Sequence, residues 1–318
     1  MNKKTKIAVI GAGISGLYIA WKLADNGHDV TVFEKRNEIG KEVCSGLFSE
    51  RILKFIPESS KLIENQINYC LVYFPRKTLK IKFSKKFFVM DHSMLDNLVL
   101  DLVKKAGAVI NLNHPVGIDD VRKVALGFNR IIGADGALSQ VRKALNCKEP
   151  NFYLGIQGFT NENNTHDFVE VWPTKTGFLW KIPRGKKVEY GIMEKREKAK
   201  KIFDQFLQKN NIKPKITKAA LIPQGLSTSS DAKFALCGDA AGLTKPWSGG
   251  GVIWSLAAAD VLLKNFPNLL KYQKELKLKF LPRIILGKLA TSGVYFFGFN
   301  FPWIIPRNYK IESDFLIA

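Results

Sequence analysis

Three glycines near the start of the chain have the spacing of a loop that binds nucleotide phosphates. Gly11, Gly13 and Gly16 follow an apolar run, residues 7–10, within KIAVIGAGISGLYIAWKLADNGHDVTVFE. In such a loop the first glycine makes a tight turn, the second lets the backbone approach a pyrophosphate, and the third lets the helix pack against the strand. The helix that begins here, with Ser15 in its first turn, offers unpaired N–H groups and a dipole that attract an anion.

An acidic residue at the end of the second strand completes this first motif. The helical pattern ends at Asn26 and Gly27, and a second strand, residues 29–33, ends at Glu34. A carboxylate at that place can bind ribose hydroxyls. Strand, helix, strand and acid in this register predict dinucleotide binding, whereas a plain glycine-rich turn would not require Glu34. The motif alone is compatible with both NAD and FAD.

A second glycine-rich helix entry occurs late in the chain, in GDAAGLTKPWSGGGVIWSLAAAD, residues 238–260. A strand-like run, residues 233–237, stops at an acid, Asp239, and a glycine tract then precedes a small-residue helix. Glycines remove the side chains that would keep a ligand away. A helix N-terminus offers about half a positive charge. The pattern permits a ligand at the helix start, and the alternative is an ordinary helix with Ser248 as its cap.

Composition indicates a globular protein with two or three lobes. The chain has 318 residues, of which 46% are hydrophobic and 24% charged. Its cysteines, Cys44, Cys70, Cys147 and Cys237, lie too far apart to predict a metal site or a disulfide framework. The N-terminus runs straight into a strand, and no window approaches the roughly 20 apolar residues of a membrane helix. We therefore expect a cytoplasmic protein without a metal.

The net charge of +21 has two readings. The positive charge can attract an anionic partner, either nucleic acid or phospholipid headgroups. It can also be a set of solvated lysines, and their scattered placement favours this reading. Since neither zinc-finger spacing nor an aromatic RNA-binding motif occurs, no nucleic-acid partner is expected.

The stretch RIIGADGALSQVRKAL, residues 130–145, predicts a strand, an Asp-Gly turn and a helix start. It resembles the second nucleotide-binding signature of FAD-dependent hydroxylase-type flavoproteins, and GDAA with its glycines resembles the third. The residues that match the second signature are Gly133, Asp135, Gly136, Ser139 and Arg142. The resemblance implies FAD as the cofactor. It implies that Asp239 binds the ribityl chain and that the ring edge meets Gly250, Gly251 and Val252.

Residues 85–118 predict a strand, a helix from about Ser93 and a further strand. This segment resembles the one in which such flavoproteins place an arginine that reaches the cofactor, but His92 occupies that position here. A neutral imidazole can still donate one hydrogen bond. Val116, expected on the following strand, matches a position whose backbone meets the adenine side. It can equally be a core residue.

Two further motifs narrow the resemblance. NEIGKEVCSGLFSERIL, residues 37–53, and VWPTKTGFLWKIPRGKKVEYGI, residues 171–192, are similar to segments of the geranylgeranyl reductase family, as is KPWSGGGV. The relatives indicated are archaeal-type digeranylgeranylglycerophospholipid reductases, and the similarity covers residues 5–280. It implies cofactor contacts from Cys44, Ser45 and Leu47. It also implies a substrate lobe in which Phe178 stands where the family has tyrosine.

The resemblance implies saturation of isoprenoid double bonds on ether phospholipids. Reduced FAD would deliver a hydride from N5 to one alkene carbon, and an acid would protonate the other. Cys44 is the candidate acid, although a thiol with a pKa near 8.5 is weak for this task; alternatively its turn only contacts the flavin. Phe178, Trp180 and Trp247 are expected to line the path of the substrate, and the first two can instead fill the core.

Other functions on the same scaffold remain open. GFLWKIP, residues 177–183, comes within one residue of the GWxWxIP pattern of flavin halogenases, so a monooxygenase or halogenase is an alternative. A degenerate flavoprotein that only binds lipid is another. No second GxGxxG loop occurs, which leaves the electron donor external: NAD(P)H, ferredoxin or a quinol.

These patterns predict an α/β protein, α+β overall. A Rossmann-like FAD-binding domain of the hydroxylase type takes residues 1–66, 86–150 and 228–268. An antiparallel β substrate lobe takes residues 67–85 and 151–227, with three strands in 151–192 and an amphipathic helix in 196–212. A C-terminal helical and apolar segment takes residues 269–318. Its lysines and aromatics can lie against the inner face of a membrane, close a lipid pocket, or pack on their own domain.

Overall fold

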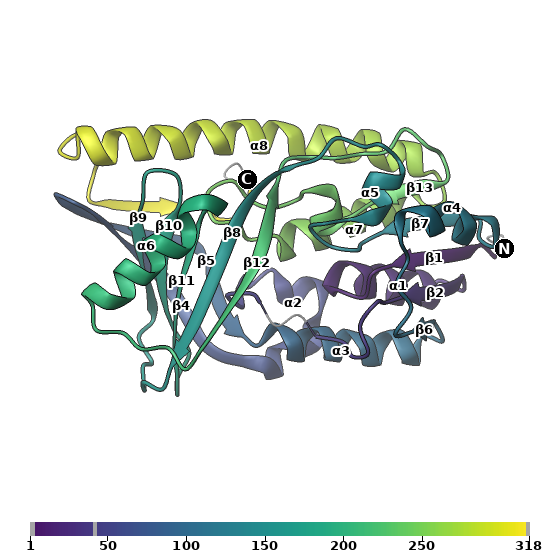
Figure 1. Cartoon of the computed structure of the whole chain (residues 1–318), viewed down its shortest axis with the longest axis horizontal. Helices are drawn as coiled ribbons and strands as arrows, with labels where there is room; N and C mark the ends of the chain where they lie inside the picture. Colours follow the sequence, from purple (N-terminus) through teal and green to yellow (C-terminus); the bar gives the residue numbers. More distant parts are fainter. Residues whose placement is uncertain (1–3, 41–42, 316–318) are drawn as a thin grey trace. The chain divides into compact units, whose positions relative to one another are not determined.

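The computed structural model describes residues 4–40 and 43–315 of the chain (Figure 1). The chain divides into two compact units, each assembled from three separate stretches. The first unit comprises Met1–Lys41, Ser93–Asn151 and Pro223–Ile284. The second comprises Glu42–His92, Phe152–Ile222 and Ile285–Ala318.

The first unit contains a five-stranded parallel sheet in the order β13-β7-β1-β2-β6. The strands are β1 Lys6–Ile10, β2 Asp29–Phe33, β6 Val109–Asn111, β7 Arg130–Gly133 and β13 Phe234–Leu236. The central strands β1 and β7 are almost wholly apolar and buried, as expected where helices cover both faces of a parallel sheet. The predicted Rossmann-like fold is confirmed.

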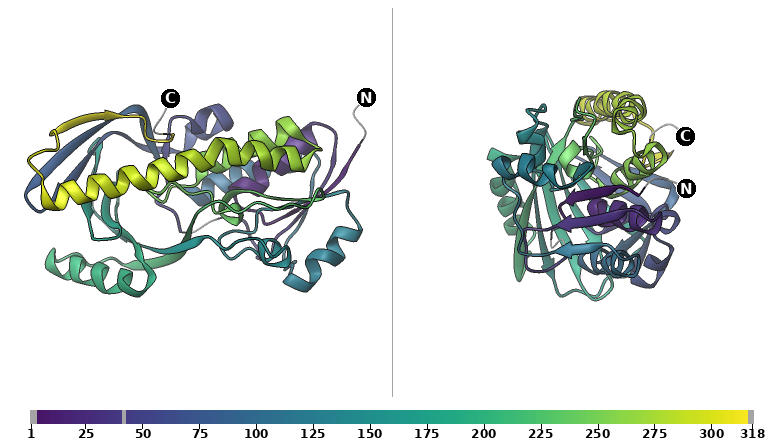
Figure 2. Two further views of the ribbon diagram at one scale, coloured as in Figure 1. Left: turned by 90° about the horizontal axis from the view of Figure 1, so that it is seen from above. Right: turned by 90° about the vertical axis from the view of Figure 1, so that its right-hand side faces the viewer.

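Helices connect these strands and begin or end where local sequence dictates. The helices and short 3-10 turn of this unit are α1 Ile14–Asp25, α3 His92–Lys105, α4 Ile118–Leu126, α5 Gln140–Ala144, η2 Gly238–Ala241 and α7 Val252–Asn265. α1 ends at Asn26 because Gly27 adopts φ +81°, which matches the predicted stop. β1, α1 and β2 (purple) lie side by side (Figure 2). α1 also packs against α7, and the Tyr18 hydroxyl donates to Asp260 Oδ1 at 3.0 Å.

The second unit contains a nine-stranded sheet in the order β12-β8-β11-β10-β9-β4-β5-β14, with β3 also paired to β5. Most neighbours are antiparallel, while β4–β9 and β5–β14 are parallel. The strands are β3 Leu47–Ser49, β4 Ile63–Phe74, β5 Lys77–Met90, β8 Asn151–Thr160, β9 Phe168–Pro173, β10 Phe178–Pro183, β11 Val188–Lys195, β12 Ile216–Gln224 and β14 Asn308–Ile311. The prediction of three strands between 151 and 192 was wrong, because the turn at Gly185, with φ +72°, starts a fourth.

Helix α6, Arg196–Lys209, covers part of this sheet. Phe203 is buried and packs with Ile156 and Ile192, while Phe206 and Leu207 flank the same cluster. The predicted amphipathic helix is therefore confirmed. Two short elements, α2 Ile52–Phe55 and η1 Pro57–Leu62, connect β3 to β4.

The last helix, α8, runs from Leu269 to Asn300 and continues through Pro282 (Figure 1, yellow-green). Its first half belongs to the first unit and its second half to the second unit. Within the described residues, no helix has both the length and the hydropathy needed to cross a membrane.

Candidate functional site

The first and third glycines of the nucleotide loop lie where no side chain fits. Gly11 has φ +102°, and a Cβ there would lie 2.4 Å from the Ala134 carbonyl oxygen. A Cβ on Gly16 would lie 2.0 Å from the Gly11 carbonyl oxygen. Both contacts are with backbone atoms, so no side-chain rotation can relieve them. The tight turn and the close helix packing expected of these two glycines are both present.

The second glycine differs, because the protein itself leaves space around it. Gly13 is the N-cap of α1 with φ −78° and ψ 175°, and no side chain caps this helix. A Cβ on Gly13 would meet no atom within 4 Å. Since internal packing does not require glycine here, the open position suits a ligand that approaches the helix start. Ser15, in the first turn, is buried.

Glu34 lies against this loop, as its place at the end of β2 predicts. Its Oε2 accepts a hydrogen bond from the Ala12 N–H at 2.7 Å, and its Oε1 accepts one from the Arg36 N–H at 3.0 Å. The carboxylate therefore fixes the loop as well as facing it. Carboxylate oxygens can accept more than one hydrogen bond, so ribose hydroxyls can still be bound.

The late GDAA turn lies directly against the nucleotide loop. Gly238 has φ +63°, and a Cβ on it would lie 2.4 Å from Ser15 Oγ. Arg142 ties the same turn to the second signature, because this fully buried guanidinium donates from Nη1 to the Ala240 carbonyl at 2.9 Å. It also forms an ion pair with Glu149 at 2.8 Å. Three motifs far apart in sequence thus meet in the first unit.

The second signature also builds its own helix start. Ser139 is the N-cap of α5, and its Oγ accepts from the Arg142 N–H at 2.9 Å. Asp135 Oδ2 accepts from the Gln140 and Val141 N–H groups at 2.6 and 3.2 Å. Burial raises the pKa of Asp135 despite these hydrogen bonds. Its other oxygen, Oδ1, is buried without a hydrogen-bond partner.

Helix α7 begins at glycine and not at a serine cap. Its N-cap is Gly251, with no side-chain cap hydrogen bond, so the alternative reading of Ser248 as the cap was wrong. A Cβ on Gly251 would lie 3.2 Å from Asp239 Oδ1, which places that carboxylate beside the helix start. Gly250 is exposed, and Val252 is the first helical residue.

A buried lysine and a tryptophan flank this helix start. Lys245 is 6% exposed, and its Nζ lies 3.5 Å from the position of a Cβ on Gly250. Its backbone N–H donates to the Gly250 carbonyl at 3.1 Å. Trp247 is partly exposed and meets Trp254 of α7 edge-on, at 5.8 Å between ring centroids. This set brings a positive charge and a ring close to the start of α7.

His92 and Val116 were also expected to contact the cofactor. The helix predicted from about Ser93 is confirmed as α3, and His92 at its start is buried with its ring 5.7 Å from that of Phe48. Val116 is buried but lies in a loop, so its assignment to a strand was wrong. The strand β6 ends earlier because Asn113 adopts φ +51°, and the backbone there bonds to residues 34 and 36.

The Cys44 loop, residues 43–46, belongs to the second unit. Cys44 is half-buried, and the Gly46 N–H donates to its Sγ at 3.4 Å. The Gly46 carbonyl accepts from the Met90 N–H at 2.9 Å. Leu47 then opens β3, which pairs with β5. Burial raises the pKa of Cys70 and of Cys237 to about 12, so neither thiol is acidic enough to act as a proton donor.

Arg184 holds this loop from a distant part of the sequence. Its side chain is 3% exposed, and its Nη1 donates to the Ser45 carbonyl at 2.7 Å. The same guanidinium donates to the Met90 carbonyl at 3.0 Å. Its ion pairs are with Glu189 at 2.9 Å and Glu64 at 3.0 Å. Sequence reasoning missed Arg184, because nothing in a lone arginine after a strand signals that it is buried.

The same network reaches the tryptophan of the substrate-lobe motif. Trp180 Nε1 donates to Glu189 Oε1 at 2.9 Å, and the indole lies over Gly191. Burial raises the pKa of Glu189, and the charge of Arg184 opposes that effect. Phe178 projects from the same strand, with its ring 5.8 Å from that of Trp180. Trp180 packs on the core yet stays partly exposed.

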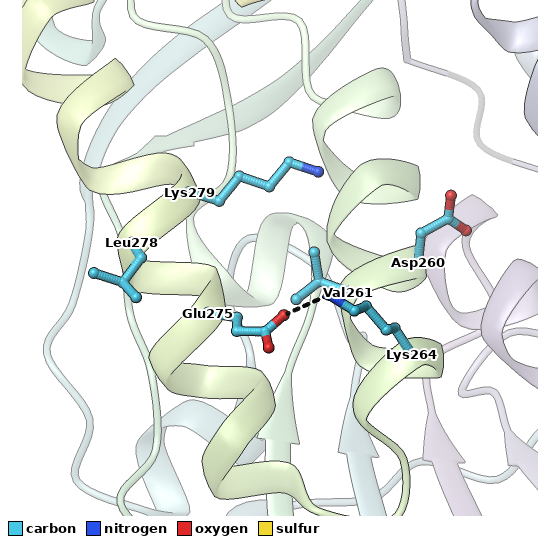
Figure 3. A pocket seen from close by; sticks show the side chains of 6 residues that line it. All are labelled: Asp260, Val261, Lys264, Glu275, Leu278 and Lys279. Atoms are coloured by element: carbon cyan, nitrogen blue, oxygen red, sulfur yellow. Dashed lines mark ion pairs between the residues drawn. The ribbon is translucent and has the colours of Figure 1, made fainter.

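An open pocket between α7 and α8 is separate from these groups. Figure 3 shows charged side chains around it, with the Lys264–Glu275 ion pair at 3.7 Å. It lies beside the later turns of α7, whereas the candidate cofactor site lies at the first turn. The pocket is lined by Asp260, Val261, Lys264, Glu275, Leu278 and Lys279. Among the described residues, no cluster of three or more potential metal ligands occurs.

Comparison with known proteins connects this geometry to a family. Residues 9–47 match the model of an NAD(P)-binding Rossmann-like domain. Over 309 residues the chain is 25% identical to the digeranylgeranylglycerophospholipid reductase of Methanococcus vannielii, covering 83% of this chain and 78% of that protein. A solved geranylgeranyl bacteriochlorophyll reductase-like protein from Thermoplasma acidophilum has a TM-score of 0.78 at 20% identity, covering 92% of this chain and 88% of that one.

The resemblance to the geranylgeranyl reductase family is confirmed. A myxobacterial chondrochloren halogenase, described as FAD-dependent, also shares the fold of this chain. Its TM-score is 0.69 at 14% identity, covering 92% of this chain and 82% of that one. The similarities together support a flavin-dependent oxidoreductase and leave the reaction open between reduction and oxygen-dependent chemistry.

Proposed function

We propose that this chain is an FAD-dependent reductase that saturates carbon–carbon double bonds of isoprenoid chains on membrane lipids. The observation that carries the proposal is the meeting of two uncapped helix starts in the first unit. α1 begins at Gly13 and α7 at Gly251, and the turn before α7 lies against Ser15. Similarity to the digeranylgeranylglycerophospholipid reductase of Methanococcus vannielii supports an isoprenoid lipid as the substrate.

The residues present fit FAD well. The open position at Gly13 and the N–H groups of α1 suit its pyrophosphate, and Glu34 suits the ribose. Asp239 would bind the ribityl chain. Gly250 and Gly251 would admit the edge of the ring, which an added side chain at either position would obstruct.

Bound and reduced, FAD supplies a hydride. The chain's own contribution is to favour negative charge at the ring edge, through the start of α7 and the ammonium of Lys245. Saturation of an alkene also requires a proton, and we assign Cys44 Sγ as its donor. The Gly46 N–H, which donates to that sulfur, would stabilise the thiolate left behind.

Substrate and electrons both come from outside the chain. Phe178, Trp180 and Trp247 would give an isoprenoid chain apolar, partly exposed surfaces to contact. Because GxGxxG occurs once in the sequence, reduction of the flavin would depend on an external donor such as NAD(P)H or ferredoxin.

The test is anaerobic incubation of dithionite-reduced protein with a digeranylgeranyl ether phospholipid, followed by mass spectrometry of the lipid. We expect the mass of two hydrogen atoms to be gained per double bond. Protein with bound FAD and an unchanged lipid would refute the reductase assignment. Protein that purifies without FAD and takes none up would favour a lipid-binding module.

A flavin-dependent halogenase or monooxygenase is the second candidate. Residues 177–183 differ by one residue from the halogenase pattern, and the chondrochloren halogenase shares the fold. This candidate predicts oxygen consumption on addition of substrate to the reduced protein in air, with an oxygen or halogen atom entering the product. It predicts no alkene saturation in the absence of oxygen.

A further inference from the structure

The second half of α8 and the segment after it expose many large apolar side chains. Trp303 is 67% exposed, Leu289 65% and Phe296 55%. We call the nine exposed residues of this segment the apolar patch. They are Ile285, Leu286, Leu289, Val294, Phe296, Phe297, Phe301, Trp303 and Ile304.

The aromatic members form one contiguous group. The Phe296 ring lies 5.4 Å from that of Phe297 and 5.7 Å from that of Phe301, between centroids. Trp303 meets Phe301 edge-on at 5.7 Å. Single exposed apolar residues need no explanation, but a continuous exposed group of large apolar side chains marks an interaction surface.

The core of the second unit uses the other side of the same helix. The Phe74 ring lies against Gly298, where a Cβ would be 2.2 Å from Phe74 Cε1. Phe299 packs beside Phe74, and the Tyr295 hydroxyl donates to the Gly177 carbonyl at 3.0 Å. The intramolecular packing of α8 is therefore satisfied by residues that do not belong to the apolar patch.

The charged side chains within the segment that carries the apolar patch are all basic. Residues 285–311 contain no aspartate or glutamate, while Lys288, Arg307 and Lys310 are all exposed. In the β5–β14 pairing, Lys310 lies directly opposite Lys82, which is also exposed. Like charges opposed on neighbouring strands repel. A nearby anionic surface would relieve that repulsion.

We propose that the apolar patch docks this chain on the surface of an anionic phospholipid bilayer, with the aromatic rings at headgroup depth. Tryptophan and phenylalanine beside basic residues are typical of segments that lie in the interface. No helix among the described residues can cross a membrane, so the contact is with one face. A second copy of the chain is a poor occupant, because each copy carries a net charge of +21.

The test uses co-sedimentation of the purified full chain with vesicles, and it requires no catalytic activity. Vesicles of phosphatidylcholine mixed with phosphatidylglycerol should bind the chain, and vesicles of phosphatidylcholine alone should bind it more weakly. The double variant Phe296→Ser/Trp303→Ser should weaken binding by at least about tenfold, which corresponds to about 1.4 kcal/mol. Lys288→Glu/Lys310→Glu should weaken binding to anionic vesicles alone.

Leu126→Ser is the matched control, since Leu126 on α4 is 87% exposed and lies outside the apolar patch. It should bind vesicles like the unmodified chain. Equal vesicle binding by Phe296→Ser/Trp303→Ser and the unmodified chain would overturn the proposal, as would no binding by the unmodified chain. Concentration-dependent dimerisation without lipid, abolished by the same double variant, would identify a second copy as the occupant and also overturn it.

Discussion

The glycine loop of the first unit and the Cys44 loop of the second unit are held in place by different means. Gly16 and Glu34 are positioned mainly by neighbours from one strand-helix-strand motif, and Gly11 by the backbone of Ala134 and Asp135. The Cys44 loop depends on Arg184, whose guanidinium reaches the Ser45 carbonyl across 139 residues of sequence. One loop is shaped by backbone sterics and the other by a buried ion network.

This difference determines how each loop responds to substitution. A glycine that contacts backbone tolerates no added atom, but the clash that a side chain would make there involves no charged group. A buried arginine stabilises the carboxylates on both sides of it, and its removal leaves the desolvated Glu189 carboxyl without its cationic partner. We therefore expect the larger loss of stability in the second unit, although the glycine loop is the more recognisable motif.

Arg184→Met should have the largest effect. Breaking a buried ion pair by removing one partner costs about 3–5 kcal/mol in the free energy of unfolding, and urea denaturation measures it. The Cys44 loop should also loosen. Alkylation of Cys44 by iodoacetamide should then accelerate relative to Cys147, the other half-buried cysteine.

Two variants separate this effect from a general loss of charge. Lys181→Met, on strand β10 shortly before Arg184, removes a partly exposed partner of Glu170 and should cost about 0–1 kcal/mol. Arg184→Met/Glu189→Gln removes the stranded carboxylate and should recover part of the lost stability. Unchanged alkylation of Cys44 in folded Arg184→Met protein would show that the loop does not depend on this arginine.

Gly16 and Gly13 of the first unit should then respond differently to alanine. Gly16→Ala forces a Cβ against the Gly11 carbonyl and should cost about 1–3 kcal/mol in the free energy of unfolding. Gly13→Ala meets no protein atom and has a compatible φ, but alanine is a poorer N-cap than glycine, so the two effects should offset and leave the stability of the FAD-free protein within about 0.5 kcal/mol of the unmodified chain.

Titration with FAD tests whether Gly13, unlike Gly16, is required for binding the cofactor. If the pyrophosphate approaches Gly13, Gly13→Ala should weaken FAD binding at least about tenfold, a difference of about 1.4 kcal/mol. Undiminished FAD affinity in Gly13→Ala, measured by calorimetry, would mean that the open space at the start of α1 is not the phosphate site.

The smallest effect should be a pH dependence at Asp135. Burial raises its pKa in the folded protein above the unfolded value, so its contribution to stability is full below the unfolded pKa and is lost as pH rises through the folded pKa. Asp135→Asn keeps an acceptor oxygen for the Gln140 and Val141 N–H groups. It should gain on the order of 1 kcal/mol near neutral pH.

That gain should disappear as the pH falls below 3.8, the ordinary pKa of an aspartate side chain. Urea denaturation across this pH range measures it, with the unmodified chain as reference. A constant difference at every pH would mean that the ionisation of Asp135 does not destabilise the fold.

Local patterns predicted much of the first unit. The acid at Glu34 and the stop at Gly27 follow from conformational and hydrogen-bonding requirements within about 30 residues, the length of one strand-helix-strand unit. The steric requirement at Gly11 comes from Ala134 and Asp135. The glycine tract before α7 also predicted an uncapped helix start. The error at Val116 arose from Asn113, whose left-handed conformation ends β6 and has no reliable sequence signal.

Long-range contacts could not be predicted in this way. The matched position of Arg142 indicated a signature, but not that it binds the Ala240 carbonyl 98 residues away. The role of Arg184 required knowledge of which strands pair, because its partners come from β4, β5, β11 and the Cys44 loop. The exposure of Phe296 likewise depends on which side of α8 the sheet covers.

Re-oxidation of the reduced flavin by the lipid tests the proposed reductase activity most directly. Protein loaded with FAD and reduced by dithionite is mixed without oxygen with an unsaturated isoprenoid ether lipid, and flavin absorbance is recorded by stopped flow. If the chain is an alkene reductase, oxidised flavin should reappear with the unsaturated lipid and not with its saturated counterpart. Reduced flavin that persists with both lipids, but is oxidised rapidly on admission of oxygen with transfer of an oxygen atom to substrate, would contradict the reductase assignment.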